Sequence, residues 1–281
     1  MPIQTGVAEE ALRRWSKALQ DNPRPILKNA QEVVPPYFIT KYQDVGDITL
    51  LIANREGVAW YDQVELSDLA YCLALGMIRR GDTVFDCGAN QGLTSLVSSL
   101  SVGLNGRVIS FEPFPLNAEL IRINCMLNGT TNVQVVQRGV ADYVGDVTIS
   151  NVTQCIYPAS IDADDALEVS ITRLDEFAEL RPHFIKIDIE GAELLCLRGA
   201  KNILSQAPAI CLEFHPEMIG KFGVPADELF KILSTESYRV YVRYEGSSTM
   251  ERYKFERVSK RCWFYCVPAN RSEISRTYLP D

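Results

Sequence analysis

The segment with the clearest chemical pattern is residues 86–92, which read Asp-Cys-Gly-Ala-Asn-Gln-Gly. It follows an apolar run at residues 83–85 and precedes a helix-like run at residues 93–97, so the order is strand, glycine-rich turn and helix. Glycines in such a turn let the backbone approach a ligand closely. The N–H groups that begin the helix can then receive a carboxylate or a phosphate. The pattern therefore predicts a ligand-binding turn.

A second acidic position indicates which ligand this turn binds. Residues 107–111 read as a buried strand, and Glu112 follows them where an acid that accepts ribose hydroxyls is expected. Asn90 replaces the middle glycine of a dinucleotide-binding turn, and Asp86 would repel a pyrophosphate but attract an ammonium group. A ligand with a ribose and an amino acid end is therefore favoured over NAD. S-adenosylmethionine is the common metabolite that has both.

Further acids and a histidine follow the later predicted strands, at residues 184–188 and 209–214. They are Asp188, Glu190, Glu193, Glu213 and His215. Because parallel strands end at one edge of a sheet, we expect these side chains to converge there. Carboxylates so close together have raised pKa values unless cations compensate them, as the sulfonium and ammonium groups of S-adenosylmethionine or a divalent metal would.

Each of these residues also has a structural explanation. Asp86 could cap the helix that follows the turn. Glu190 and Glu193 could be acids favoured by the dipole in the first turn of a helix. Glu213 could pair with a nearby Lys or Arg, and His215 could be a surface residue.

The elements that must position these residues alternate regularly from residue 83 onward. Apolar strands separated by helix-like segments are typical of an α/β fold whose parallel sheet is covered on both faces. Residues 238–244 and 262–267 lack an intervening helix pattern and are predicted to be an antiparallel pair. Residues 146–172 are β-like and acidic, which favours a hairpin insertion.

The first part of the chain has a different pattern. Residues 8–20 read as an amphipathic helix, and residues 37–61 as short strands with turns. We therefore expect an N-terminal helical and β extension at residues 1–64 that packs on the core. Residues 65–281 would then form the sheet-containing domain, with the β-rich insertion near residues 146–172.

Composition and charge limit the partners and the compartment. The net charge of the 281 residues is −8, and no block of Lys and Arg occurs, so no nucleic acid partner is expected. The longest strongly apolar stretch, near residues 69–78, is shorter than the ~20 residues of a membrane helix, and the chain starts without a secretory leader. Eight cysteines without a C-x-x-C pair favour buried, reduced thiols. We expect a cytoplasmic protein with a small-molecule partner and no membrane partner; a homodimer is compatible with the sequence.

Four motifs together resemble the FkbM-type methyltransferases, which use S-adenosylmethionine and have a Rossmann-like fold. They are the turn at residues 86–92, Phe-Glu-Pro at 111–113, Lys-Ile-Asp-Ile-Glu-Gly-Ala-Glu at 186–193 and Leu-Glu-Phe-His at 212–215. The resemblance covers roughly residues 60–268, and the 186–193 block is its most specific motif. It implies a class I methyltransferase fold: a seven-stranded, mostly parallel sheet with an antiparallel last strand and helices on both faces.

The resemblance also implies methyl transfer, usually to a hydroxyl of a natural product or sugar. With S-adenosylmethionine as cofactor, we expect Glu112 to accept the ribose hydroxyls and Asp142 to contact the adenine amino group. The remaining cofactor-binding residues would surround the methionine portion and the ribose; they are Asp86, Gly88, Asn90 and Gly92.

The chemistry itself requires a positioned acceptor. Methyl transfer from a sulfonium is an in-line displacement, and the acceptor oxygen must lie about 3 Å from the methyl carbon. A hydroxyl acceptor benefits from a base, so the expected catalytic residues are His215, Asp188 and Glu190. In a second version, in which a divalent metal is considered but not assumed, Asp188, Glu190, Glu213 and His215 hold the ion.

Three other functions stay open from the sequence. A carboxylate acceptor, on a peptide or a small molecule, would need no base. A nicotinamide-dependent oxidoreductase is disfavoured by Asn90, and a non-catalytic binding protein is disfavoured by the intact turn and Glu112.

Overall fold

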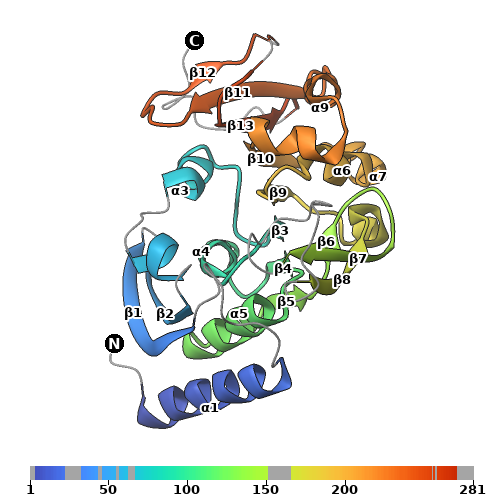
Figure 1. Ribbon diagram of the computed structural model, residues 1–281. Helices are drawn as coiled ribbons and strands as arrows, with labels where there is room; N and C mark the ends of the chain where they lie inside the picture. The colour runs from blue at the N-terminus through green and yellow to red at the C-terminus, as the bar shows by residue number, and fades with distance from the viewer. Residues whose placement is uncertain are drawn as a thin grey trace.

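The computed structural model describes residues 4–22, 33–43, 46–54, 57–62, 67–150, 166–254, 256 and 258–270 (Figure 1). The helical elements are α1 (Thr5–Asp21), η1 (Val58–Asp62), α3 (Ser67–Ala74), α4 (Leu93–Val102), α5 (Pro115–Leu127), η2 (Leu174–Leu180), α6 (Glu193–Arg198), α7 (Lys201–Leu204), α8 (Pro216–Ile219), η3 (Gly220–Phe222) and α9 (Ala226–Leu233). The strands are β1 (Val33–Gln43), β2 (Gly46–Asn54), β3 (Thr83–Cys87), β4 (Arg107–Phe111), β5 (Val133–Val136), β6 (Gly139–Val140), β7 (Gly145–Ser150), β8 (Ala166–Thr172), β9 (Phe184–Ile187), β10 (Ala209–Phe214), β11 (Tyr238–Tyr244), β12 (Glu251–Arg252) and β13 (Cys262–Pro268).

The main sheet has the strand order β12-β11-β13-β10-β9-β3-β4-β5. Strands β5, β4, β3, β9 and β10 run parallel to one another. The last strand, β13, lies between β10 and β11 and is antiparallel to both. The expected mostly parallel sheet with an antiparallel last strand is therefore confirmed. The two-residue strand β12 adds an eighth strand at the edge, and it is too short to leave a pattern in the sequence.

Helices cover both faces of this sheet because its strands are apolar on both sides. Successive residues of β3 point to opposite faces: Val84 packs with α3, α4 and α5, and Phe85 packs with α6, α7 and α9. All five residues of β3 are buried. The α/β class with helices on both faces is confirmed.

The N-terminal elements lie against the α4 and α5 side of the sheet. Strands β1 and β2 form an antiparallel hairpin, and the buried side of β2 joins the core beneath α4. Helix α1 lies alongside α5 at one end of the molecule, where Trp15 is 2% exposed (Figure 1). The expected division between residues 64 and 65 lies outside the described residues and stays a prediction.

The expected insertion contains strands, but they form a sheet of their own. Strands β7 and β8 are antiparallel, and β6 pairs with β8, giving the order β6-β8-β7. Residues 151–165 of this insertion lie outside the described residues. After β9 the chain forms two short helices, α6 and α7. The chain turns between them at Gly199, where a Cβ atom would lie 2.0 Å from the Ala141 carbonyl oxygen.

Two expectations drawn from composition can be compared with the described residues. Seven of the cysteines are free and buried there, as expected; Cys155 lies outside these residues. Across the same part of the chain, none of the helices combines the length and the apolar character that crossing a membrane requires.

Candidate active site

The glycine turn fits closely between two strand ends. Gly88 has a φ of 77°, and a Cβ atom there would lie 1.8 Å from the Asp188 carbonyl oxygen. The N–H groups of Gly88 and Ala89 both donate to the carbonyl oxygen of Phe111, at 3.1 Å. Gly92, with a φ of 92°, precedes the first residue of α4 and packs on Ile121. A glycine is therefore needed at this turn, because the backbone segments at the ends of β3, β4 and β9 meet there without room for a side chain.

Glu112 lies beside this turn, as the sequence predicted. It directly follows β4 and is 3% exposed. Its carboxylate accepts hydrogen bonds from the backbone N–H groups of Asn90, at 2.8 Å, and Phe114, at 3.0 Å. Asn90 has a φ of 51°, a left-handed conformation that asparagine tolerates better than most residues. The structure thus brings Asn90 and Glu112 together.

Asp86 is placed differently from the expectation. It lies within β3, is fully buried, and accepts a hydrogen bond of 2.5 Å from the Ser95 hydroxyl. Burial raises the pKa of Asp86, and Lys186 opposes this effect from 3.7 Å. Asp86 does not cap α4, because the N-cap residue of that helix is Gly92. Its side chain supports the turn from inside the protein, and its contact with a ligand stays a prediction.

A second tight turn follows β9 and carries the next acids. Glu190 and Gly191 have φ values of 53° and 103°, and a Cβ atom on Gly191 would lie 2.6 Å from Cβ of Met218. The Gly191 N–H donates to Oε1 of Glu193 at 2.9 Å. The same oxygen lies 2.8 Å from Nδ1 of His215. This turn and α8 therefore pack together, and Glu193 links them.

The expected catalytic residues converge on His215, which is 3% exposed. Its Nε2 atom lies 3.5 Å from Oε1 of Glu213, 3.6 Å from Oε2 of Glu190 and 3.9 Å from Oδ1 of Asp188. We call His215 and these three acids the acidic cluster. The sequence predicted that all four would lie together, and the structure places them so.

The pKa of His215 bears on its expected role as a base. Burial alone would lower this pKa, but the contacts with Glu193, Glu213 and Asp188 raise it to about 11. A pKa raised in this direction makes His215 a poor candidate for the base. Burial raises the pKa of Glu190. In this arrangement the carboxylates of Asp188 and Glu190 are better placed than His215 to act as the base.

Two cations that sequence reasoning did not assign complete the site. Lys186 Nζ lies 3.1 Å from Oδ2 of Asp188 and donates to the Gly88 carbonyl oxygen at 3.0 Å, so it connects the two turns. Nearby carboxylates raise the pKa of Lys186, although its burial opposes this effect. Lys186 is part of the 186–193 motif and could have been found from its position on a buried strand.

The second cation is Arg261, whose Nε donates to Oε1 of Glu213 at 2.6 Å. The pKa of Glu213 falls to about 2: burial alone would raise it, but His215 and Arg261 outweigh that effect. The structural explanation for Glu213, pairing with a cation, therefore holds together with its place in the cluster. Arg261 precedes the last strand and had no signal in the sequence.

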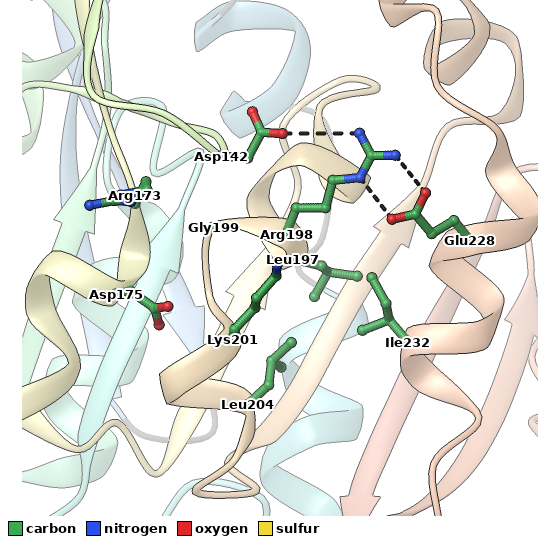
Figure 2. Close-up of a pocket in the computed structure, with 10 residues that line it drawn as sticks. All are labelled: Asp142, Arg173, Asp175, Leu197, Arg198, Gly199, Lys201, Leu204, Glu228 and Ile232. Carbon is green, nitrogen blue, oxygen red and sulfur yellow. Dashed lines mark hydrogen bonds and ion pairs between the residues drawn. The ribbon is translucent and has the colours of Figure 1, made fainter.

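Asp142 lies in a different pocket, of about 500 Å³, between α6, α7, α9 and η2 (Figure 2). Its Oδ2 atom is 4.0 Å from Nη1 of Arg198, and Nη2 of the same arginine forms an ion pair with Glu228. Figure 2 shows Asp142 and Glu228 on either side of the Arg198 guanidinium group. The structure does not bring Asp142 to the acidic cluster, and its contact with adenine stays a prediction.

A smaller cavity of about 70 Å³ adjoins the acidic cluster. Its polar lining includes Lys186, Asp188 and Glu213, and its apolar lining includes Leu69 and Trp263. A polar group that entered this cavity would meet carboxylates within a largely apolar surrounding.

The family model described as Methyltransferase FkbM domain matches residues 86–240, more than half of the chain. The chain belongs to the FkbM methyltransferase family. The matched region contains the glycine turn, Glu112 and all four members of the acidic cluster, so the family resemblance expected from the motifs is confirmed.

Individual relatives are more distant. Hexuronic acid methyltransferase AglP of Haloferax volcanii is 24% identical over 172 residues, which is 58% of this chain and 65% of the relative, so less than two thirds of that relative is spanned. A crystal structure of methyltransferase FkbM from Methylobacillus flagellatus KT is 22% identical with a TM-score of 0.43, over 66% of this chain and 43% of that chain. A SAM-dependent methyltransferase from Aquifex aeolicus is 17% identical with a TM-score of 0.42, over 75% of this chain and 94% of that chain.

Proposed function

We propose that this FkbM family member is an S-adenosylmethionine-dependent O-methyltransferase that acts on a hydroxyl group of a small molecule. The observation that carries the proposal is the position of Glu112. Its carboxylate lies at the carboxyl end of β4, hydrogen-bonded to the backbone N–H of Asn90 in the glycine turn. An acid at this point is the group that accepts ribose hydroxyls in related α/β folds.

The residues present fit a sulfonium nucleoside. Each oxygen of a carboxylate accepts more than one hydrogen bond, so Glu112 can keep its backbone contacts and accept those of a ribose diol. The absence of side chains at Gly88 and Gly92 lets the turn pack tightly against Asp188 and Ile121, which holds its backbone beside Glu112. The carboxylates beyond β9 and β10 favour the positive charge of the sulfonium and ammonium groups.

The chemical step divides between the cofactor and the protein. S-adenosylmethionine supplies a methyl group whose C–S bond breaks as the new C–O bond forms, with the electron pair remaining on sulfur. Asp188 accepts the proton of the acceptor hydroxyl at Oδ1, because Lys186 holds Oδ2 at 3.1 Å. His215 and Glu193 hold the turn after β9 in place through their 2.8 Å hydrogen bond. These groups position the acceptor for in-line attack.

The proposed acceptor class is supported by the relative from Haloferax volcanii. The named substrate class of that relative is a hexuronic acid, a sugar that has both hydroxyl groups and a carboxylate. Sugars and sugar acids are therefore the first acceptors to test here. The same relative favours a second candidate, methylation of the carboxylate, for which Asp188 would not be needed as a base.

The cofactor-binding step is tested by calorimetric titration with S-adenosylmethionine. We expect Glu112→Gln to weaken binding at least tenfold, because a hydrogen bond to a charged group contributes roughly 1.5–3 kcal/mol and about 1.4 kcal/mol is a factor of ten. Glu217→Gln, an exposed carboxamide substitution on α8, should bind as the parent does. Absence of binding to the parent protein, or an unchanged affinity in Glu112→Gln, would refute the cofactor site.

The acceptor chemistry is tested by the stability of the product. A sugar-acid panel is incubated with methyl-labelled S-adenosylmethionine, and the product is treated with mild alkali. A methyl ether keeps its label, whereas a methyl ester releases labelled methanol. Alkali-stable label supports transfer to a hydroxyl, and alkali-labile label shows that the carboxylate is the acceptor.

A further inference from the structure

We propose that Asp188, Glu213 and His215 form a binding site for one divalent metal ion. One ligand atom from each of the three side chains lies within 4.8 Å of the other two. Carboxylate oxygens and an imidazole nitrogen together suit an ion such as Mn²⁺, which accepts both kinds of ligand. The role of the ion in catalysis rests on the proposed function, whereas its binding does not.

The observation that points to a ligand is the Nε2 atom of His215. The side chain is 97% buried, since only 3% of it is exposed, and Nε2 has no hydrogen-bond partner among the described residues. The other ring nitrogen, Nδ1, is 2.8 Å from Glu193, so the ring is held with Nε2 directed at the carboxylates of Asp188 and Glu213. Buried polar atoms are nearly always satisfied, and a metal ion would satisfy this one.

Each of the three proposed ligands is oriented by a neighbouring side chain. Glu193 holds the imidazole of His215, Lys186 Nζ lies 3.1 Å from Oδ2 of Asp188, and Arg261 donates to Glu213 at 2.6 Å. Carboxylate–histidine pairs and fixed carboxylates of this kind typically surround metal ligands in proteins. The three orienting side chains, Glu193, Lys186 and Arg261, thus support a metal site. They do more than neutralise the charges of the proposed ligands.

The site is closed on one side and open on the other. The side chains of His215 and Glu213 are 3% and 9% exposed, but that of Asp188 is 30% exposed and lines the 70 Å³ cavity. A three-ligand site with an open position is typical of catalytic rather than structural metals. The acceptor hydroxyl would bind at the open position, where the ion lowers its pKa.

The proton released from the acceptor needs a destination. When its O–H bond breaks, the proton passes to the carboxylate of Glu190, whose side chain is 41% exposed and can return it to solvent. Glu190 lies 3.6 Å from Nε2 of His215, beside the proposed ion. In this version Asp188 is a ligand, and Glu190 is the base.

The competing occupant of the site is a proton on Nε2, which would make His215 an imidazolium between carboxylates. A titration of the tag-free full chain with Mn²⁺ distinguishes a bound ion from a bound proton. The concentration of free Mn²⁺ is measured from its electron paramagnetic resonance signal. We expect one bound ion per chain in the parent. His215→Ala and Asp188→Ala should bind at least tenfold more weakly, and Glu193→Gln should lose 10–100-fold in affinity. Glu217→Gln should bind Mn²⁺ as the parent does, since this carboxylate is exposed on α8.

Two results would overturn the metal site. One is a parent protein that leaves the free Mn²⁺ signal unchanged. The other is equal affinity in the parent and in folded His215→Ala and Asp188→Ala, with folding checked by circular dichroism. Calorimetry with S-adenosylmethionine in excess EDTA separates this outcome from failure of the proposed function. Cofactor binding without Mn²⁺ binding refutes the metal site alone, and Mn²⁺ binding without cofactor binding refutes the methyltransferase activity alone.

Discussion

At the scale of single residues, the site is defined by how carboxylates and cations share a small volume. Asp188 has one oxygen near Lys186 and the other directed at the acidic cluster, and its side chain is 30% exposed. Glu213 is nearly buried and is already paired with Arg261. Of these two acids, Asp188 is therefore the one that an acceptor can reach, and its Oδ1 atom faces His215.

We expect Asp188→Asn to lower kcat by about 10²–10⁴-fold, because the amide neither accepts the acceptor proton nor binds a cation well. The dissociation constant for S-adenosylmethionine should change far less than kcat, since Glu112 and the glycine turn are untouched and only one of the carboxylates that favour the positively charged cofactor is lost. Steady-state kinetics with the labelled methyl donor and calorimetry measure the two effects separately. A variant with parental kcat would remove Asp188 from the chemistry.

At the scale of elements, the site depends on two turns that touch each other. The turn after β3 and the turn after β9 meet where Gly88 faces the Asp188 carbonyl oxygen. Lys186 donates a hydrogen bond to the Gly88 carbonyl oxygen at the same place. A side chain at Gly88 would push the two turns apart and would move both the cofactor loop and the acidic cluster. The close contact explains why a glycine is required at that position.

Comparison of Gly88→Ala with Gly129→Ala tests this requirement. Both glycines have positive φ values, of 77° and 61°, but a Cβ atom at Gly129 would meet nothing within 4 Å. Gly129→Ala should lose only the roughly 1–2 kcal/mol of a left-handed alanine. Gly88→Ala should lose more than this in the free energy of unfolding, measured in urea, and should also lose S-adenosylmethionine binding. Equal losses in the two variants would show that the close contact does not matter.

The sequence predicted these elements well where a pattern of residue types is typical of only one kind of structure. Strands β3, β4, β9 and β10 are apolar on both faces, and the acids that follow them share one edge by topology, so Glu112 and the acidic cluster were predictable. Asp86 and Asp142 were placed less well. Asp86, near the end of a strand, could face either the core or the rim, and Asp142 lies in a bend after β6. The pairing of Asp86 with Ser95 and of Asp142 with Arg198 depends on contacts between distant segments. Arg261 was missed for the same reason.

At the scale of the whole molecule, the N-terminal hairpin is joined to the cofactor turn by asparagine and glutamine side chains. Asn124 of α5 accepts the Leu51 N–H of β2 at 2.8 Å and donates to the Gln91 carbonyl oxygen at 2.8 Å. Gln91 in turn donates to Asn54 at the end of β2, at 2.7 Å. We infer that the N-terminal extension helps to fix the conformation of the cofactor turn, because one buried residue, Asn124, connects β2, α5 and the turn.

Asn124→Ala tests this connection. Asn124 is fully buried, so the substitution leaves the Leu51 N–H and the Gln91 carbonyl oxygen without their partner. We expect a loss of about 1–3 kcal/mol in the free energy of unfolding, together with weaker S-adenosylmethionine binding. Asn132→Ala is the control, since the partly buried Asn132 also makes side-chain hydrogen bonds, to Ser99 and Gly103, away from the turn.

The control variant should lose stability but keep its cofactor affinity, because the backbone of residues 88–92 keeps every hydrogen bond to α5 and β4. Urea denaturation and calorimetry on the same two variants measure both quantities. If Asn124→Ala and Asn132→Ala lose equal stability and both bind S-adenosylmethionine as the parent does, the hairpin stabilises the fold but does not act on the site. A selective loss of affinity in Asn124→Ala would instead mean that an element outside the parallel sheet sets the shape of the turn that receives the cofactor.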